Sequence, residues 1–205
     1  AYTAALDFGV HGISIGTRAD CLPDDVIALL SQINNRTHLT VELGLQTVHD
    51  KTAQIINRCY TYDEFLNGYR KLKNAGIRTC LHLIDGLPGE TKADMLETAK
   101  EVARLHPDAV KIHLLHVNRN TALEQIYLAG NYSPLTRDEY IDIVISQLEY
   151  LPADIVIERI TGDADKRCLV APLWSADKIA VLGGIDRQMK LRDTYQGIKC
   201  DSGQP

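Results

Sequence analysis

The fold is decided by an alternation that is clearest in the stretch HLTVELG, residues 38–44. The apolar side chains of Leu39, Val41 and Leu43 alternate with the polar ones of Thr40 and Glu42. This period of two predicts a β-strand with two unlike faces. Four other stretches repeat the pattern: HGISIGT (11–17), IRTCLHLI (77–84), AVKIHLLHV (109–117) and DIVIERI (154–160).

Amphipathic stretches separate these strands. Gly76 stands where a C-cap glycine ends a helix, and Thr91 with Asp94 has the pattern of a capping box. Strands joined by helices need crossover connections, so the sequence predicts an α/β fold with a parallel sheet. Five strands fit part of a TIM-like βα barrel, with a doubly wound sheet as the alternative. The spacing of apolar residues predicts helices over 23–33, 50–58, 62–75, 91–105, 122–128, 136–151 and 176–191.

The 205 residues show no linker and no break in composition. We therefore expect a single domain over 1–205 that ends in a polar tail at 198–205. The opening AYTAALDF is typical of a helix end that feeds a strand. It favours a chain that is the C-terminal portion of a larger barrel and lacks the first strand or strands.

Composition excludes several classes of protein. With 45% hydrophobic and 24% charged residues the chain is not disordered, and a net charge of −5 argues against coating nucleic acid by bulk charge. No apolar run approaches the roughly 18 residues that cross a bilayer, and no secretion signal is visible. We expect a cytoplasmic protein without membrane contact. Five scattered cysteines without a C-x-x-C pair predict neither a disulfide framework nor a zinc ribbon or iron–sulfur site built from closely spaced thiolates.

The second face of the predicted strands is polar. In a barrel the apolar face packs against the helices, and the polar face points into the lumen. Burying several unpaired ionisable groups costs several kcal/mol each, so a repeated polar face favours a ligand or metal site. This face carries Ser14, Thr40, Glu42, Cys80, His82, Lys111, His113, Val156 and Glu158.

Polar residues also follow the carboxyl ends of the strands. In βα folds these ends face one common cavity, where ligands bind. The candidates at this position are Thr17, Arg18, Asp20, Gln46, Asp85, His116, Asn118, Arg159, Thr161 and Asp163.

Taken together, several motifs resemble the radical S-adenosylmethionine (radical SAM) superfamily. The likeness is to a bacterial subgroup described as elongator-like or as oxygen-independent coproporphyrinogen oxidase-like, and it covers nearly the whole chain. The motifs are SIGTRAD (14–20), ELGLQT (42–47), NR (57–58), HLIDGLPGET (82–91), KIHLLHV (111–117), APLW (171–174) and TYQG (194–197).

The resemblance implies a partial barrel of the radical SAM type, with S-adenosylmethionine and a [4Fe–4S] cluster as cofactors. In this family the reduced cluster splits S-adenosylmethionine to methionine and a 5′-deoxyadenosyl radical, which abstracts hydrogen from a substrate. It also implies a reductase partner such as flavodoxin or ferredoxin, and a small-molecule or RNA substrate. The family's C-x-x-x-C-x-x-C motif does not occur in this chain. We therefore expect the chain alone to be inactive.

The resemblance also suggests roles for residues. Gln46 and Arg58 match family positions that help to hold S-adenosylmethionine. His82 stands where coproporphyrinogen oxidases have an acidic residue, and Gly16 stands where they have a glutamate. Glu42 is expected to take over a carboxylate role. The expected cofactor-binding set is Ser14, Thr17, Arg18, Glu42, Gln46, Arg58 and His82, and the expected substrate pocket is His113, His116, Glu158 and Arg159.

Two other functions fit the residues. Glu42, His82, His113 and Glu158 are also the residue types that would bind a divalent ion in a TIM-barrel hydrolase or isomerase, where the ion lowers the pKa of its water. A non-catalytic scaffold that keeps the barrel shape is the third interpretation.

Overall fold

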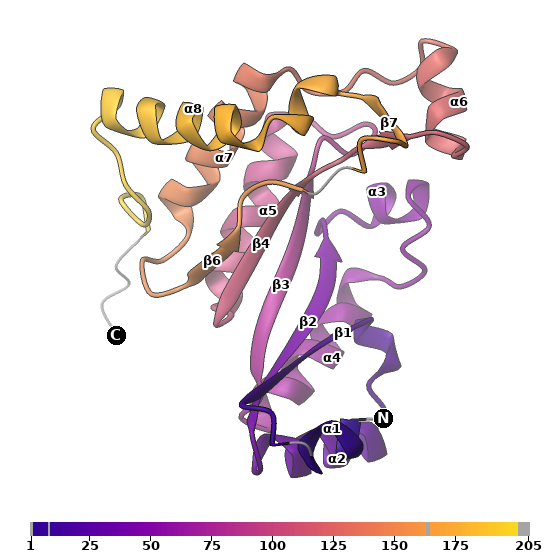
Figure 1. The fold of residues 1–205 in the computed structure, drawn as a ribbon, viewed down its shortest axis with the longest axis vertical. Coiled ribbons are helices and arrows are strands. Elements are labelled where there is room, and N and C mark those ends of the chain that lie inside the picture. Colours follow the sequence, from indigo (N-terminus) through magenta and orange to yellow (C-terminus); the bar gives the residue numbers. More distant parts are fainter. Residues whose placement is uncertain (1, 8, 163–164, 201–205) are drawn as a thin grey trace.

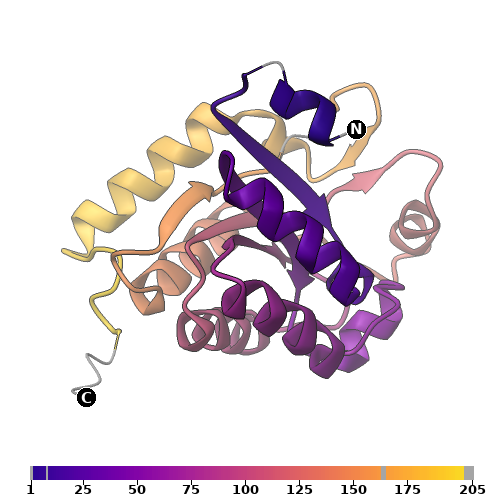
Figure 2. The ribbon, with the colours of Figure 1, turned by 90° about the horizontal axis from the view of Figure 1, so that it is seen from below.

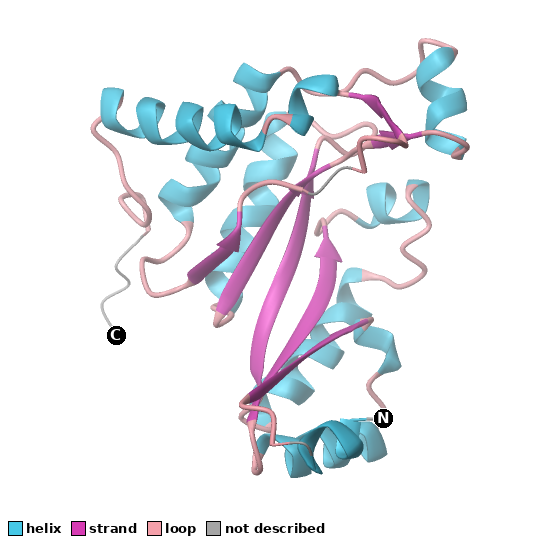
Figure 3. Cartoon of the chain, viewed as in Figure 1, coloured by secondary structure: helices cyan, strands magenta, loops and turns pink. Residues whose placement is uncertain are grey.

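The computed structural model describes residues 2–7, 9–162 and 165–200. Five parallel strands form one sheet in the order β1-β2-β3-β4-β6 (Figures 1 and 3). Strands that follow one another in the chain are neighbours in this sheet, as expected when a helix returns the chain after each strand. The strands are β1 (Gly12–Thr17), β2 (His38–Gln46), β3 (Arg78–Asp85), β4 (Ala109–Leu114) and β6 (Val156–Arg159).

Helices line one face of the sheet, as Figure 2 shows. A doubly wound sheet would be covered by helices on both faces, so the predicted βα-barrel arrangement is the correct alternative. Helix α5 also packs against α7, and α7 against α8, which crosses α7 at one end of the molecule (Figure 1). The helices are α1 (Tyr2–Asp7), α2 (Asp24–Asn34), α3 (Asp50–Ile55), α4 (Tyr62–Asn74), α5 (Lys92–Leu105), α6 (Ala122–Leu128), α7 (Arg137–Tyr150) and α8 (Lys178–Leu191), with short 3-10 helices at Ala19–Cys21 and Leu173–Ala176.

The apolar faces of the strands form the core under these helices. Side chains at alternate positions of β2, β3 and β4 are fully buried there, as the period of two predicts. Phe65 and Leu72 of α4 and Val144 of α7 close the core from the helix side. Burial of this one face therefore fixes the register and sends the polar positions to the other face. The strand residues concerned include Leu39, Val41, Leu43, Leu81, Leu83, Val110 and Ile112.

Local signals in the sequence set several helix ends correctly. The capping box of Thr91 and Asp94 is present at the start of α5. Gly76 adopts φ +64° after α4, a conformation that glycine reaches without steric cost. The helix predicted over 50–58 ends earlier, at Ile55, because Asn57 turns the backbone to φ +54°.

A second, antiparallel sheet is absent from the sequence prediction. The strand expected over 109–117 stops at Leu114, and the chain continues into β5 (Val117–Asn118), which pairs with β7 (Leu169–Ala171). No helix among the described residues is long and apolar enough to cross a membrane.

The first part of the polar tail predicted at 198–205 packs against the fold. The Lys199 backbone N–H donates to the carbonyl of Glu149 at 2.8 Å, and the Lys199 ammonium group pairs with the Glu149 carboxylate. The end of the chain is therefore held against α7 as far as residue 200. Residues 201–205 lie outside the described part, as does the predicted site candidate Asp163.

A buried carboxyl group joins β3 to α7. The sequence predicts Asp85 beside the common cavity, but it ends β3 on the buried apolar face, where its Oδ1 accepts a hydrogen bond of 2.7 Å from Gln147 Nε2. Complete burial, only partly offset by this bond, raises the pKa of Asp85 to about 7. Asp85 Oδ2 has no partner among the described residues. A neutral, protonated carboxyl group is therefore the form that the core favours.

We predict that the contribution of Asp85 to the free energy of unfolding, measured as the difference between the unsubstituted protein and Asp85→Asn, falls as pH rises from about 4 to about 7. In this interval the unfolded chain has lost the Asp85 proton, whereas the folded chain still holds it, and the full effect is on the order of 4 kcal/mol. Asp85→Asn should remove this dependence and be the more stable protein at pH 8, as urea denaturation followed by circular dichroism would measure.

The matched control is Asp108→Asn. Asp108 accepts from the Thr79 backbone N–H at 2.8 Å, and its pKa is lowered, so its charged form is the stabilising one. This variant should lose stability at both pH 5 and pH 8. A lower urea midpoint for Asp85→Asn than for the unsubstituted protein at pH 8 would contradict the assignment.

Candidate functional site

The polar faces of four strands converge on one carboxylate, that of Glu42 on β2. Glu42 accepts hydrogen bonds from Ser14 Oγ on β1 at 2.5 Å, His82 Nε2 on β3 at 2.7 Å and Lys111 Nζ on β4 at 2.5 Å. Side chains alternate between the two faces of a strand, so these four residues, which alternate with buried apolar ones, lie on the inner face of the sheet. We call these four residues the Glu42 cluster. The convergence agrees with the polar face predicted from the sequence.

Charge pairing holds the cluster in its ionised form. Burial by itself would raise the pKa of Glu42, but hydrogen bonds from Lys111, Ser14 and His82 outweigh it and lower the pKa to about 2. Burial opposes the charge of Lys111 in the same way, and the Glu42 carboxylate more than compensates, so the pKa of Lys111 is raised. Glu158 of β6 adds a second carboxylate 3.5 Å from Lys111 Nζ.

Two histidines stack beside this charge pair. The rings of His82 and His113 have centroids 5.1 Å apart. Burial lowers the pKa of both, and in His113 the neighbouring His82, Arg159 and Lys111 add to it and bring the pKa to about 4. Both imidazoles are therefore neutral at pH 7. Because a carboxylate only accepts, Nε2 of His82 carries the proton that it donates to Glu42.

Several buried polar atoms on this side lack a partner among the described residues: Gln46 Oε1, His113 Nε2, His116 Nε2 and Asn118 Oδ1. A buried polar atom without a hydrogen bond costs about 1–3 kcal/mol, so four of them near one end of the sheet call for an explanation. A bound ligand with donors and acceptors of its own would satisfy them.

The end of β2 is irregular at Gln46. The pairing with β3 shifts between Gly44 and Gln46, and Gln46 itself adopts φ +65°. Its side chain folds back over Gly44, where an added Cβ would lie 2.6 Å from Gln46 Nε2. Glycine at 44 therefore leaves the room that the Gln46 amide occupies.

The side chain of Arg58 holds the backbone of the loop after β2 in place. Its side chain is buried, and it donates to the carbonyls of Leu45 (2.9 Å), Thr47 (2.6 Å) and Tyr60 (2.9 Å). It also pairs with Asp50 at 3.1 Å. Arg58 thus fixes the loop after β2, and with it the backbone next to Gln46.

The other predicted residues lie at the rim of the sheet. Arg18 pairs with Asp20 at 2.6 Å and stacks on the ring of Tyr60, 5.4 Å from its centroid, while Thr17 only approaches the carbonyl of Arg18. Arg159 lies near the stacked histidines, whose pKa values it lowers. His116 packs under Gly162, where an added Cβ would be 3.0 Å from its Cε1.

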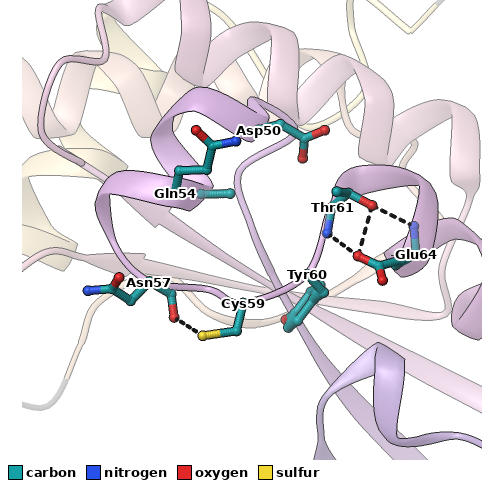
Figure 4. Close-up of a pocket in the computed structure, with 8 residues that line it drawn as sticks. Asp50, Gln54, Asn57, Cys59, Tyr60, Thr61 and Glu64 are labelled. Carbon is teal, nitrogen blue, oxygen red and sulfur yellow. Dashed lines mark hydrogen bonds between the residues drawn. The ribbon is translucent and has the colours of Figure 1, made fainter.

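Figure 4 shows a separate hollow of about 350 Å³ between α3 and the start of α4. The Cys59 thiol on its wall donates to the Asn57 carbonyl at 3.0 Å. No member of the Glu42 cluster lines this hollow, so it is distinct from the interior. Its lining residues are Asp50, Ala53, Gln54, Asn57, Cys59, Tyr60, Thr61 and Glu64.

The site does not have the geometry of a metal centre. Within the described part of the chain no group of three or more His, Cys, Asp and Glu residues is placed to hold a metal ion. Lys111 neutralises Glu42, and Cys80 on the same face is a protonated thiol, because burial and the nearby Glu158 raise its pKa to about 12. The residues present therefore do not fit an iron–sulfur cluster, nor the divalent ion of the hydrolase alternative.

Sequence reasoning misses two residues of the site. It places Lys111 on the inner face but not in the site, although a lone inward-facing cation requires an acidic partner. Tyr60, whose ring contacts both Arg18 and Arg58, has no strand pattern around it. Asn118 is among the polar residues predicted beyond the fourth strand, but it lies on β5, a strand that the sequence does not predict.

Comparison with known proteins agrees with this geometry. The Radical SAM superfamily matches residues 2–102, and the Radical_SAM C-terminal domain matches residues 107–191. The protein YtqA of Bacillus subtilis (strain 168) is 47% identical over 193 residues, which are 94% of this chain and 60% of YtqA. YhcC of Escherichia coli (strain K12) is 32% identical over 181 residues, which are 88% of this chain and 59% of YhcC.

A solved structure shares the fold. The archaeal Methanocaldococcus infernus Elp3 with an N-terminal deletion superposes with a TM-score of 0.76 at 21% identity, over 90% of this chain and 43% of that one. The chain belongs to the radical SAM superfamily and has its partial barrel fold. The family predicted from the motifs is confirmed. The chain spans about 60% of the length of YtqA and of YhcC.

We predict that Glu42→Gln destabilises the protein by about 1–3 kcal/mol, because Lys111, whose side chain is 16% exposed, then keeps only the more distant Glu158. Urea denaturation at pH 7 measures the change. Glu158→Gln is the control, and it should cost less because Glu42 still pairs with Lys111. Equal losses for the two variants would show that Glu42 is not the central partner.

Proposed function

We propose that the full-length protein is a radical SAM enzyme and that this chain supplies most of the wall that holds S-adenosylmethionine and the substrate. Family membership and the polar inner face support the proposal. Together, S-adenosylmethionine and a reduced [4Fe–4S] cluster supply a 5′-deoxyadenosyl radical in this family. The observation that carries the proposal is the set of unpartnered buried atoms, which includes Gln46 Oε1 at the end of β2 and Nε2 of His113, the ring stacked on His82.

The inner face suits the polar groups of S-adenosylmethionine. The ligand carries an amino group, a carboxylate and ribose hydroxyls, which are donors and acceptors for Gln46, His82 and Ser14. Gly16 is the register partner of Glu42 in the parallel pair β1–β2. The Glu42 carboxylate therefore lies beside the position at which coproporphyrinogen oxidases have their glutamate, and we assign it the same role. Arg58 acts through the loop backbone, and Thr17 and Arg18 complete the rim.

The substrate is assigned to the other side of the same interior. His113, His116, Glu158 and Arg159 lie on β4, β6 and the turn after β4, next to the Glu42 cluster. The two histidines are neutral at pH 7, since burial lowers the pKa of each. They therefore offer a hydrogen-bond acceptor without a competing charge. The proposed function is compatible with a small molecule or an RNA as the substrate, and with flavodoxin or ferredoxin as the electron donor.

The chain's own residues would serve the radical step by positioning and by excluding water. A preorganised, paired carboxylate needs no solvent reorganisation when the ligand binds. The apolar core behind the sheet keeps the strands rigid, so the inner side chains keep their spacing. We assign the ligands of the iron–sulfur cluster to a part of the full-length protein outside these 205 residues.

The test is the formation of 5′-deoxyadenosine. Full-length protein, reconstituted anaerobically with iron and sulfide and then reduced with dithionite, should convert S-adenosylmethionine to methionine and 5′-deoxyadenosine, detected by chromatography. Gln46→Ala should weaken S-adenosylmethionine binding by about tenfold, because a buried acceptor is lost. Gln125→Ala on the exposed α6 is the control and should bind normally. If the protein loaded with its iron–sulfur cluster shows no binding of S-adenosylmethionine above the buffer background, the proposal is wrong.

A further inference from the structure

A groove lies between the start of α7 and the middle of α8, away from the inner face of the sheet. Its volume is about 590 Å³. Arg137 and Asp138 line it from α7, and Gly183 and Arg187 line it from α8. Arg192, just after α8, closes one end. Figure 1 shows α8 crossing α7 at this place. None of the residues discussed above as cofactor or substrate contacts takes part.

The groove is positively charged in a protein whose net charge is −5. It has three arginines and a single acidic residue, Asp138, on its walls. Arg192 is paired with Asp142 at 2.8 Å. Arg137 and Arg187 have no acidic partner in the described part of the chain. Arg137 stands in the first turn of α7, where Asp138 and Glu139 already compensate the helix dipole, so the positive charge of the groove comes from the arginine side chains.

Gly183 keeps the groove open without serving the packing of this chain. The next residue, Gly184, is needed for packing, because a Cβ there would lie 2.6 Å from Ile141 Cδ1. A Cβ at Gly183 would meet nothing within 4 Å. Glycine within a helix costs about 1 kcal/mol relative to alanine. The bare backbone at 183 is therefore unfavourable for this chain alone, and it leaves room for a group that approaches α8 closely.

We propose that this groove binds the backbone phosphates of a nucleic-acid strand. A guanidinium group presents a planar fork that matches two phosphate oxygens. Arg137 and Arg187 present two such forks without an acidic partner in the described part of the chain, and Arg192, paired with Asp142, adds positive charge at one end of the groove. One inorganic phosphate would leave most of the 590 Å³ to water, whereas a strand brings successive phosphates and fills it with sugar. The helix backbone at Gly183 then forms the floor on which the strand lies. Asp138 lowers the net positive charge of the groove, and we place it at the edge of the contact with the strand.

This inference does not rest on the proposed radical chemistry. A strand bound here would be held whether or not S-adenosylmethionine is cleaved, so the two proposals fail separately. The binding is electrostatic and independent of sequence, so it should weaken as salt rises.

The test is fluorescence anisotropy of a labelled, mixed-sequence single-stranded RNA oligonucleotide with the full-length protein, titrated at several salt concentrations. Arg187→Ala should raise the dissociation constant several-fold and reduce the salt slope by about 0.7, the value for one phosphate contact on a single strand. Arg137→Ala should act likewise. Arg70→Ala, an exposed arginine of α4 far from the groove, is the control and should leave both values unchanged.

Gly183→Ala separates binding from folding. The added methyl group meets open space within the chain and improves helix propensity, so thermal stability should rise while RNA affinity falls. Unchanged affinity and salt slope in Arg137→Ala/Arg187→Ala would overturn the proposal. It would also be overturned if inorganic pyrophosphate, at the same phosphate concentration, competed as well as an unlabelled strand.

Discussion

One ion pair, between Glu42 on β2 and Lys111 on β4, organises the inner face of the sheet. Glu42 and Lys111 are far apart in the sequence, and β3 lies between their two strands in the sheet. Without Lys111, burial would push the Glu42 pKa upward and favour a neutral acid; with it, the carboxylate is ionised and accepts from Ser14 and His82 as well. A single carboxylate thereby ties four strands together on the face that has no hydrophobic core.

The two faces of the sheet divide stability and function between them. The helix side buries the apolar positions, and complete burial there raises the pKa of Asp85 to about 7. The inner side is polar, partly open, and leaves acceptors such as His113 Nε2 unpartnered. In the function that we propose, S-adenosylmethionine and the substrate supply the hydrogen-bond donors that these acceptors lack.

Much of this arrangement follows from the sequence, because a period of two fixes which side chains share a face. The alternation alone is enough to predict that Ser14, Glu42 and His82 lie on one face. The features that it misses depend on contacts distant in the chain: the β5–β7 pairing joins residues about fifty positions apart, and Lys199 docks on Glu149. The motif around Arg58 matches a cofactor position. Only the structure shows that its guanidinium is occupied by backbone carbonyls, because that depends on the turn at Asn57.

The central claim is that the side chains of the inner face are preorganised around an ionised Glu42 carboxylate, with the imidazoles of His82 and His113 neutral beside it. The most direct measurement is the pH titration of the imidazole ¹⁵N signals of His82 and His113, with and without S-adenosylmethionine. The account predicts that His113 stays neutral down to about pH 4 and that the ring signals of His82 shift when S-adenosylmethionine is added. Two histidines that both titrate near pH 6.5, as exposed imidazoles do, and ignore the ligand would contradict it.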